Sequence, residues 1–242
     1  EALITALADP SFYARDEAAW ALAVLGAPAA KRLMARLGSV PRREWPLAAL
    51  ALGRSGLAVA ESRAIDLLQR GLAETSGSLR RHYLYAAGEI ETARGLAALA
   101  PPINALISDP DPRTRAVAVW AAGALVGPIG ELLDWPDIRR AAVADSDPAV
   151  RAEAAAALGK ALACRYDRAD GEALRRTMDD QSSRVRFVRG QAVRLLAEAG
   201  KALDIGLPAE DADHGVRFER ALLESALKHQ YRGVHAEGGS IL

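Results

Sequence analysis

The sequence is poor in the features that support disulfides and strongly charged surfaces. Its 242 residues contain a single cysteine, Cys164, which excludes an intramolecular disulfide framework and a cysteine-rich zinc site. Lysine and arginine number 31, and so do aspartate and glutamate, so no field of the whole molecule draws it to nucleic acid or an anionic membrane. Any binding of that kind requires a local patch of charge.

Long apolar runs are also missing. No stretch reaches the roughly 18 to 20 consecutive apolar residues of a membrane-spanning helix, because the run at 96–107 is interrupted by Pro101 and Pro102. The chain opens with Glu1, and no basic segment leads into an apolar one, so the sequence predicts no signal peptide. With the lone cysteine, these features favour a cytoplasmic protein that makes no membrane contact.

The sequence lacks the spacings typical of catalytic and metal sites. None of its four histidines is placed to put two metal ligands on one helix face, and the acidic cluster at 210–213 lacks the glycine spacing of a calcium loop. No phosphate-binding glycine loop, nucleophile elbow or dinucleotide fingerprint occurs. Cys164 follows an alanine-rich helix and is predicted to be a small buried hydrophobe. We therefore expect no catalytic residue, metal or cofactor.

The chain does contain a repeated helical pattern. Alanine is abundant, while glycine and proline fall between segments of helical length. Segments that end in a small or aliphatic residue followed by glycine recur at intervals of 27, 35, 35 and 36 residues. These register glycines are Gly26, Gly53, Gly88, Gly123 and Gly159. A period of this length is typical of helix pairs that stack into a solenoid.

Helix-start signals precede these segments. The clearest are Asp111-Pro112 and Asp147-Pro148. An aspartate before the first turn accepts hydrogen bonds from its free N–H groups, and proline at the first helical position sacrifices no hydrogen bond. Asp9-Pro10 is predicted to play the same part in the first repeat. The pattern indicates one helix pair per period.

These units resemble the HEAT-repeat family, in particular the short bacterial HEAT-like repeats of the phycobilin lyases. The most specific units run from Asp111 to Gly123 and from Asp147 to Gly159. The resemblance implies an all-α fold, a right-handed α-solenoid of about six HEAT-like helix pairs over residues 1–205. A loop and a C-terminal capping helix are expected at 206–232, because an end repeat has no neighbour to cover its core. A flexible tail is expected at 233–242.

The columns of the aligned repeats predict the core. The fifth position and the first position before each register glycine are mostly small or aliphatic, which indicates buried positions. In the first repeat these positions hold Ala21 and Leu25, and their equivalents are Ala48 and Leu52, Tyr83 and Ala87, Ala118 and Ala122, and Ala154 and Leu158.

Other columns mix aromatic and charged residues along one face of the second helix of each pair. HEAT-like proteins usually present their concave surface there, so the resemblance implies a groove for a partner. Aromatic and arginine side chains often anchor interfaces. The predicted partner-binding residues are Trp20, His82, Tyr85 and Trp120 for contact area, with Arg43, Arg81 and Arg113 for charge at the edge. The alternative is that the tryptophans fill gaps between repeats; for Trp45 and Trp135 packing is the favoured role.

Arginines near the helix starts allow two interpretations. Arg115 and Arg151 each follow a capping aspartate by four residues and resemble the aspartate and arginine ladder that ties neighbouring HEAT repeats together. The planar guanidinium group suits such a ladder and equally suits a phosphate or carboxylate of a ligand. Arg115, Arg151 and Arg186 therefore form an alternative, anion-binding set.

The favoured function is a non-catalytic scaffold or adaptor that binds another protein or a peptide segment. The alternative is binding of nucleic acid or another anionic ligand, which the balanced charge disfavours because phosphate contacts supply most of that affinity. Alkylpurine DNA glycosylases and phycobilin lyases share the fold, and those activities rest on fold analogy alone. Deoxyhypusine hydroxylases carry repeated His-Glu pairs, which this chain lacks. The sequence predicts no oligomeric state.

Overall fold

The computed structural model describes residues 1–90, 93–165, 167–198, 213–219 and 221–222. All regular secondary structure in these segments is helical. The chain divides into two compact units, Glu1–Leu133 (Unit 1) and Asp134–Leu242 (Unit 2). Of the predicted loop and capping helix at 206–232, only 213–219 and 221–222 are described, and the predicted tail at 233–242 lies outside the described residues.

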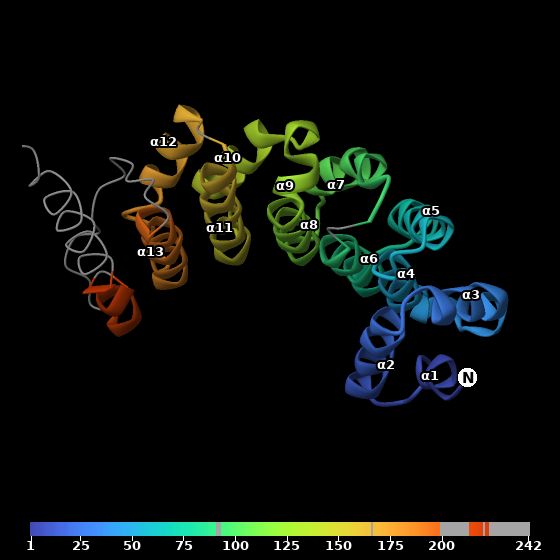
Figure 1. The fold of residues 1–242 in the computed structure, drawn as a ribbon. Coiled ribbons are helices and arrows are strands. Elements are labelled where there is room, and N and C mark those ends of the chain that lie inside the picture. Colours follow the sequence, from blue (N-terminus) through green and yellow to red (C-terminus); the bar gives the residue numbers. More distant parts are fainter. Residues whose placement is uncertain (91–92, 166, 199–212, 220, 223–242) are drawn as a thin grey trace, which may run out of the picture. The chain divides into compact units, whose positions relative to one another are not determined.

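Helix pairs build both units (Figure 1). Unit 1 contains α1 (Ala2–Ala6), α2 (Phe12–Val24), α3 (Ala27–Arg36), α4 (Trp45–Gly53), α5 (Ala58–Glu74), α6 (Gly77–Glu89), α7 (Ala100–Leu106), α8 (Pro112–Ala124) and α9 (Val126–Ile129). Short 3-10 turns lie at Leu37–Ser39, Arg42–Glu44, Leu96–Leu99 and Gly130–Leu132. Unit 2 contains α10 (Trp135–Ala144), α11 (Pro148–Cys164), α12 (Arg168–Arg176) and α13 (Ser183–Glu198).

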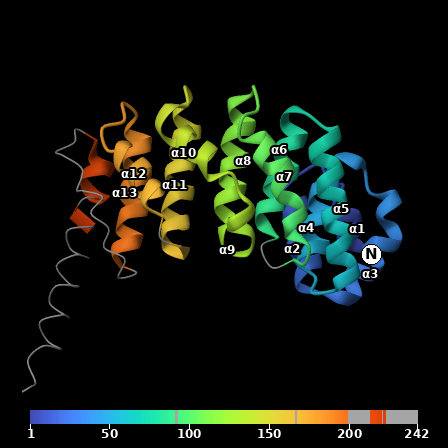
Figure 2. The same ribbon diagram turned by 90° about the horizontal axis from the view of Figure 1, so that it is seen from above.

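The second helix of each pair packs against the second helix of the next pair within a unit. In Unit 1, α2 contacts α4, α4 contacts α6, and α6 contacts α8; in Unit 2, α11 contacts α13 (Figure 2). The first helices α3, α5 and α7 contact one another in the same order. The all-α fold class built from stacked helix pairs is therefore confirmed.

Small residues allow this close stacking, as the column comparison predicts. Ala48, Ala118 and Ala154 are completely buried. A β-carbon added at Gly159 would lie 2.5 Å from the β-carbon of Ala192 on α13, so glycine is required where those two helices meet. Small side chains at the contact let the backbones approach, and the larger Leu158 fills the adjoining core.

The capping prediction is confirmed for two helices. The carboxylate of Asp111 accepts hydrogen bonds from the N–H groups of Arg113 and Thr114, and Asp147 accepts one from Ala149. The prediction for Asp9 is wrong in register, because α2 begins at Phe12 and its N-cap is Ser11. Asp9 instead accepts a hydrogen bond from the N–H of Ser11.

The predicted core register is also wrong in the first repeat. Leu25 is 58% exposed, and the buried residues of α2 are Ala18, Ala19, Leu22 and Ala23. The cause is Gly26, which has φ 64° and caps the start of α3, whereas the other register glycines lie within their helices. The buried face of α2 therefore lies three residues earlier than predicted.

Cys164 is exposed, so its prediction as a buried hydrophobe is wrong. It is the last residue of α11 and follows the buried Leu162 by two positions. Two residues correspond to about 200° of rotation around a helix, which turns the thiol away from the buried face.

The described residues contain no single helix with the length and apolar character of a membrane span. One pair, Pro112–Ala124 with Val126–Leu132, meets the criteria of length and composition when taken together, and it is bent by 75° at the break.

Candidate functional site

An open cavity of about 890 Å³ lies in Unit 1, where the starts of α2 and α4 meet the exposed faces of α6 and α8. It brings together five of the seven predicted partner-binding residues, namely Arg43, Arg81, His82, Tyr85 and Trp120. The remaining lining residues are Pro10, Phe12, Arg15, Glu44, Pro46, Leu47, Ser78, Leu79, Ala86 and Val117. The lining is thus mainly apolar and aromatic, with arginines among it.

A stacked aromatic pair forms part of this lining. The rings of Tyr85 on α6 and Trp120 on α8 are nearly parallel, with centroids 5.3 Å apart and an interplanar angle of 12°. Trp120 also packs against the backbone at Gly88, where an added β-carbon would lie 2.5 Å from its ring atom Cζ3. Trp120 therefore fills the gap between two repeats and also lines the cavity.

The other tryptophans lie elsewhere. Trp20 is not among the residues that line the cavity, and the guanidinium of Arg54 lies 4.1 Å above its ring centre. Arg54 in turn donates to the carbonyl oxygen of Glu89 on the next repeat at 2.7 Å. Trp135 is buried, as the packing interpretation predicts, and Trp45 donates its ring N–H to the carbonyl oxygen of Val40.

Glu44 anchors one side of the cavity. Its carboxylate is 3.1 Å from Nε of Arg15 and 3.1 Å from Nε of Arg43, and its side chain is only 8% exposed. Arg15 also donates to the carbonyl oxygens of Asp9 and Pro10, so it fixes the turn before α2 against the start of α4. The guanidinium of Arg43 is on the outside of this cluster, since its side chain is 73% exposed.

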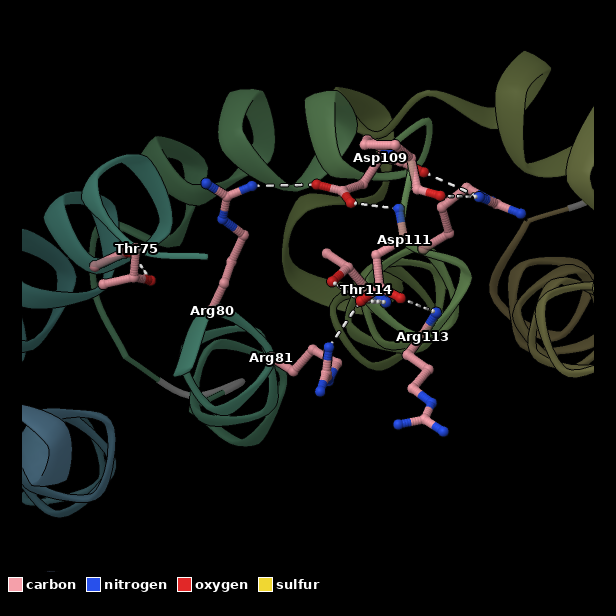
Figure 3. A network of polar contacts seen from close by, with 10 residues as sticks. Thr75, Arg80, Arg81, Asp109, Asp111, Arg113 and Thr114 are labelled. Atoms are coloured by element: carbon pink, nitrogen blue, oxygen red, sulfur yellow. Dashed lines mark hydrogen bonds and ion pairs between the residues drawn. The ribbon is translucent and has the colours of Figure 1, made fainter. Parts of the chain in front are cut away.

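Arg81 lies on α6 and is held by the cap of α8. Its Nη1 donates to Oδ2 of Asp111 at 2.7 Å, and the hydroxyl of Thr114 donates to the same oxygen at 2.7 Å (Figure 3). The hydrogen bond from Thr114 is the main reason that the pKa of Asp111 lies below its usual value. Arg113 is exposed, does not line the cavity, and extends away from this cap.

The titratable groups of the lining are tuned by their surroundings. Burial lowers the pKa of His82; Arg81 and Arg15 lower it as well, while Glu44 raises it. Burial also raises the pKa of Tyr85, and the nearby carboxylates of Glu89 and Asp16 act in the same direction. At neutral pH the cavity therefore presents a neutral imidazole and a neutral phenol.

The arginines of the alternative set bind the backbone of their own repeats. Arg115, Arg151 and Arg186 each donate Nη1 to two backbone carbonyls in the turn that precedes their own helix. Arg151 additionally binds both carboxylate oxygens of Asp180 from the next repeat, at 2.6 and 2.9 Å. Arg80 makes the corresponding contact with Asp109 at 3.1 Å (Figure 3). The ladder interpretation is confirmed for Arg151.

Sequence reasoning missed the part of the lining that comes from the helix starts. Pro10 lies in the turn before α2, Phe12 is the first residue of α2, and Pro46 and Leu47 belong to the first turn of α4. Column comparison relates equivalent positions in successive second helices. The residues on this side of the cavity occupy positions that are not equivalent in the repeats, so the comparison does not identify them. The turn signal at Asp9-Pro10 points to this region.

Comparison with known proteins agrees with the helical fold. Residues 99–197 match the family model of HEAT repeats. The chain has the fold of armadillo and HEAT repeat proteins. A designed armadillo repeat protein in complex with the peptide (KR)4 is 17% identical, with a TM-score of 0.54 over 93% of this chain and 98% of that one. YibA of Escherichia coli is 14% identical, with a TM-score of 0.62 over 94% of this chain and 90% of that one. No curated protein matches this chain in sequence.

Proposed function

We propose that this chain is a non-catalytic scaffold that holds a segment of a partner protein in the Unit 1 cavity. The observation that carries the proposal is the stacked pair of Tyr85 and Trp120 on the wall of an open cavity of about 890 Å³. Rigid aromatic side chains in a concave apolar site are the residues that most often dominate binding energy. The designed armadillo protein in complex with the peptide (KR)4 illustrates that a fold of this type can bind a peptide.

Nucleic acid remains the second candidate, through Arg115, Arg151 and Arg186. In each of these arginines Nη1 is already donated to backbone carbonyls of its own chain, which lowers the number of donors left for phosphate. Affinity for nucleic acid would fall steeply with salt, because bound phosphates release counterions. The intramolecular bonds of this set are the reason that we favour a protein partner.

The test is selection of peptides from a random library on immobilised protein, followed by affinity measurements on Tyr85→Ala and Trp120→Ala. We expect each variant to lose roughly tenfold or more in affinity, as hot-spot residues do, with unchanged helical circular dichroism. Tyr13→Ala is the matched control, because Tyr13 is 82% exposed and does not line the cavity. Selected peptides that bind both cavity variants as tightly as the wild type would refute the proposal.

A further inference from the structure

The lining of the cavity carries an excess of positive charge although the whole chain is neutral. Arg15, Arg43 and Arg81 line it, and Glu44 is the acidic residue among the described lining residues. The chain as a whole has 31 basic and 31 acidic side chains, so this excess is local. A local excess of charge of one sign at a concave apolar site selects partners of the opposite charge.

The carboxylate of Glu44 does not offset this excess toward a ligand. It is nearly buried, and each of its oxygens lies 3.1 Å from an arginine nitrogen of the same cluster. A lysine or arginine of a partner would have to displace Arg15 or Arg43 to reach it, at the cost of an existing ion pair. The cavity therefore offers little to a basic side chain.

The arginines, in contrast, keep donors available to a ligand. Arg43 contacts Glu44 through Nε, and its exposed guanidinium makes no other ion pair in the described part of the chain. Arg81 uses Nη1 for Asp111, which leaves the remaining nitrogens of its planar group. Arg113 follows in the first turn of α8 and makes no ion pair with any described residue. Arginine with open donors suits carboxylates, which it binds through two parallel hydrogen bonds.

Apolar surface lies beside these donors. Leu47, Val117 and the stacked rings of Tyr85 and Trp120 form the apolar wall of the same cavity. We propose that the partner segment carries an aromatic or aliphatic anchor flanked by acidic residues, with the anchor on the aromatic pair and the carboxylates on Arg43 and Arg81. This inference rests on the proposed function and adds the chemistry of the partner.

The experiment measures fluorescence anisotropy of four labelled peptides of equal length on the full chain. The acidic probe alternates glutamate with leucine, the neutral probe replaces each glutamate with glutamine, the basic probe alternates lysine with arginine, and the polar probe alternates glutamate with serine. We expect the acidic leucine probe to bind roughly five to ten times more tightly than the neutral probe, a ratio that falls as salt rises. The basic and polar probes are expected to bind far more weakly than either.

Charge reversal identifies the residues responsible. Arg43→Glu is expected to reduce the ratio of acidic-probe to neutral-probe affinity by roughly threefold or more, because it removes one of the two proposed carboxylate donors and adds a negative charge. The Arg43 side chain is 73% exposed, so the variant retains its packing. Arg70→Glu makes the same change on the exposed surface of α5, outside the cavity lining, and is expected to keep the preference.

The outcomes separate this inference from the proposed function. If the neutral or basic probe binds as tightly as the acidic probe, and Trp120→Ala weakens it, the charge inference fails while the scaffold function stands. If no probe is sensitive to Trp120→Ala, the scaffold function fails. If single-stranded oligothymidylate displaces the acidic probe and the polar probe binds equally well, the cavity binds polyanions in general, and the peptide inference is overturned.

Discussion

The ring of Trp120 on α8 lies 5.3 Å from the ring of Tyr85 on α6 and is almost parallel to it. The same indole packs on the backbone at Gly88, one turn along from Tyr85 on α6. The orientation of the aromatic wall therefore depends on the absence of a side chain at Gly88. This arrangement couples the packing between two repeats to the geometry of the cavity.

Gly88→Ala is expected to displace Trp120 and destabilise Unit 1. The new β-carbon would lie 2.5 Å from Cζ3 of the indole, closer than side-chain carbons approach, so the ring must shift from its present position. Overpacking of this kind costs about 1–3 kcal/mol. The midpoint of urea denaturation and the near-ultraviolet circular dichroism of the aromatic residues report the change.

Gly127→Ala is the control for this substitution. Gly127 lies in the short helix α9, and an added β-carbon would meet no atom within 4 Å. Its denaturation midpoint should equal or slightly exceed that of the wild type, because alanine restricts the unfolded chain more than glycine does. Equal behaviour of the two variants would contradict the dependence of Trp120 on Gly88.

Arg151→Gln is expected to destabilise Unit 2 by about 2 kcal/mol. The substitution removes two hydrogen bonds to Asp180 and leaves that carboxylate, whose side chain is 10% exposed, without its cation. Chemical denaturation measures the loss. Arg175→Gln, which alters an exposed pair between Arg175 and Glu172, should change the free energy of unfolding by less than about 0.5 kcal/mol.

The contribution of Arg151 to the free energy of unfolding should disappear in acid. Burial raises the pKa of Asp180, but the hydrogen bonds from Arg151 and from the N–H of Ser182 outweigh it, so the pKa lies below its usual value. A carboxylate with a lowered pKa stabilises the fold above its unfolded pKa of about 3.9, and this contribution is lost as the pH falls through the lower, folded pKa. The difference in unfolding free energy between wild type and Arg151→Gln should therefore shrink below about pH 4. A difference that stays constant into that range would refute the assignment.

His82 should titrate below the ordinary histidine pKa of about 6.5. Burial disfavours its charged form, and Arg81 and Arg15 add to the effect against the opposing influence of Glu44. Nuclear magnetic resonance of the imidazole gives the midpoint directly. Arg81→Gln should raise the midpoint and Glu44→Gln should lower it. Because the unfolded chain binds the proton more tightly, this group also makes the fold less stable as the pH falls below about 6.5. A midpoint at or above 6.5 in the wild type would be inconsistent with this environment.

The repeated architecture was predictable because its signals are local. The aspartate caps of α8 and α11 and the buried alanine columns follow from neighbouring residues in the sequence. The core prediction for the first repeat failed because Gly26 has the same residue type as the other register glycines but adopts a positive-φ conformation that caps α3. Glycine is used both within helices and as a helix cap, and the residue type alone does not distinguish these two roles. The finer resemblance to phycobilin lyases stays a prediction.

The candidate site was predictable only in part. Tyr85, His82 and Trp120 occupy the same face of the second helix in their respective repeats, so column comparison found them. Phe12 and Pro46 lie at helix starts, and their approach to the same cavity depends on the turn that Arg15 holds against Glu44. Contacts between residues distant in the sequence carry no periodic signal, which is why these residues were missed.

The ladder of arginine and aspartate has a consequence for how such a chain can change in length. Arg80 and Arg151 each reach forward to an aspartate in the turn before the second helix of the next pair, Asp109 and Asp180 respectively. A duplicated period would therefore arrive with both halves of its junctions already present. Gain or loss of whole repeats by recombination therefore requires no new contacts, because both residues of the junction are encoded within the copied repeat.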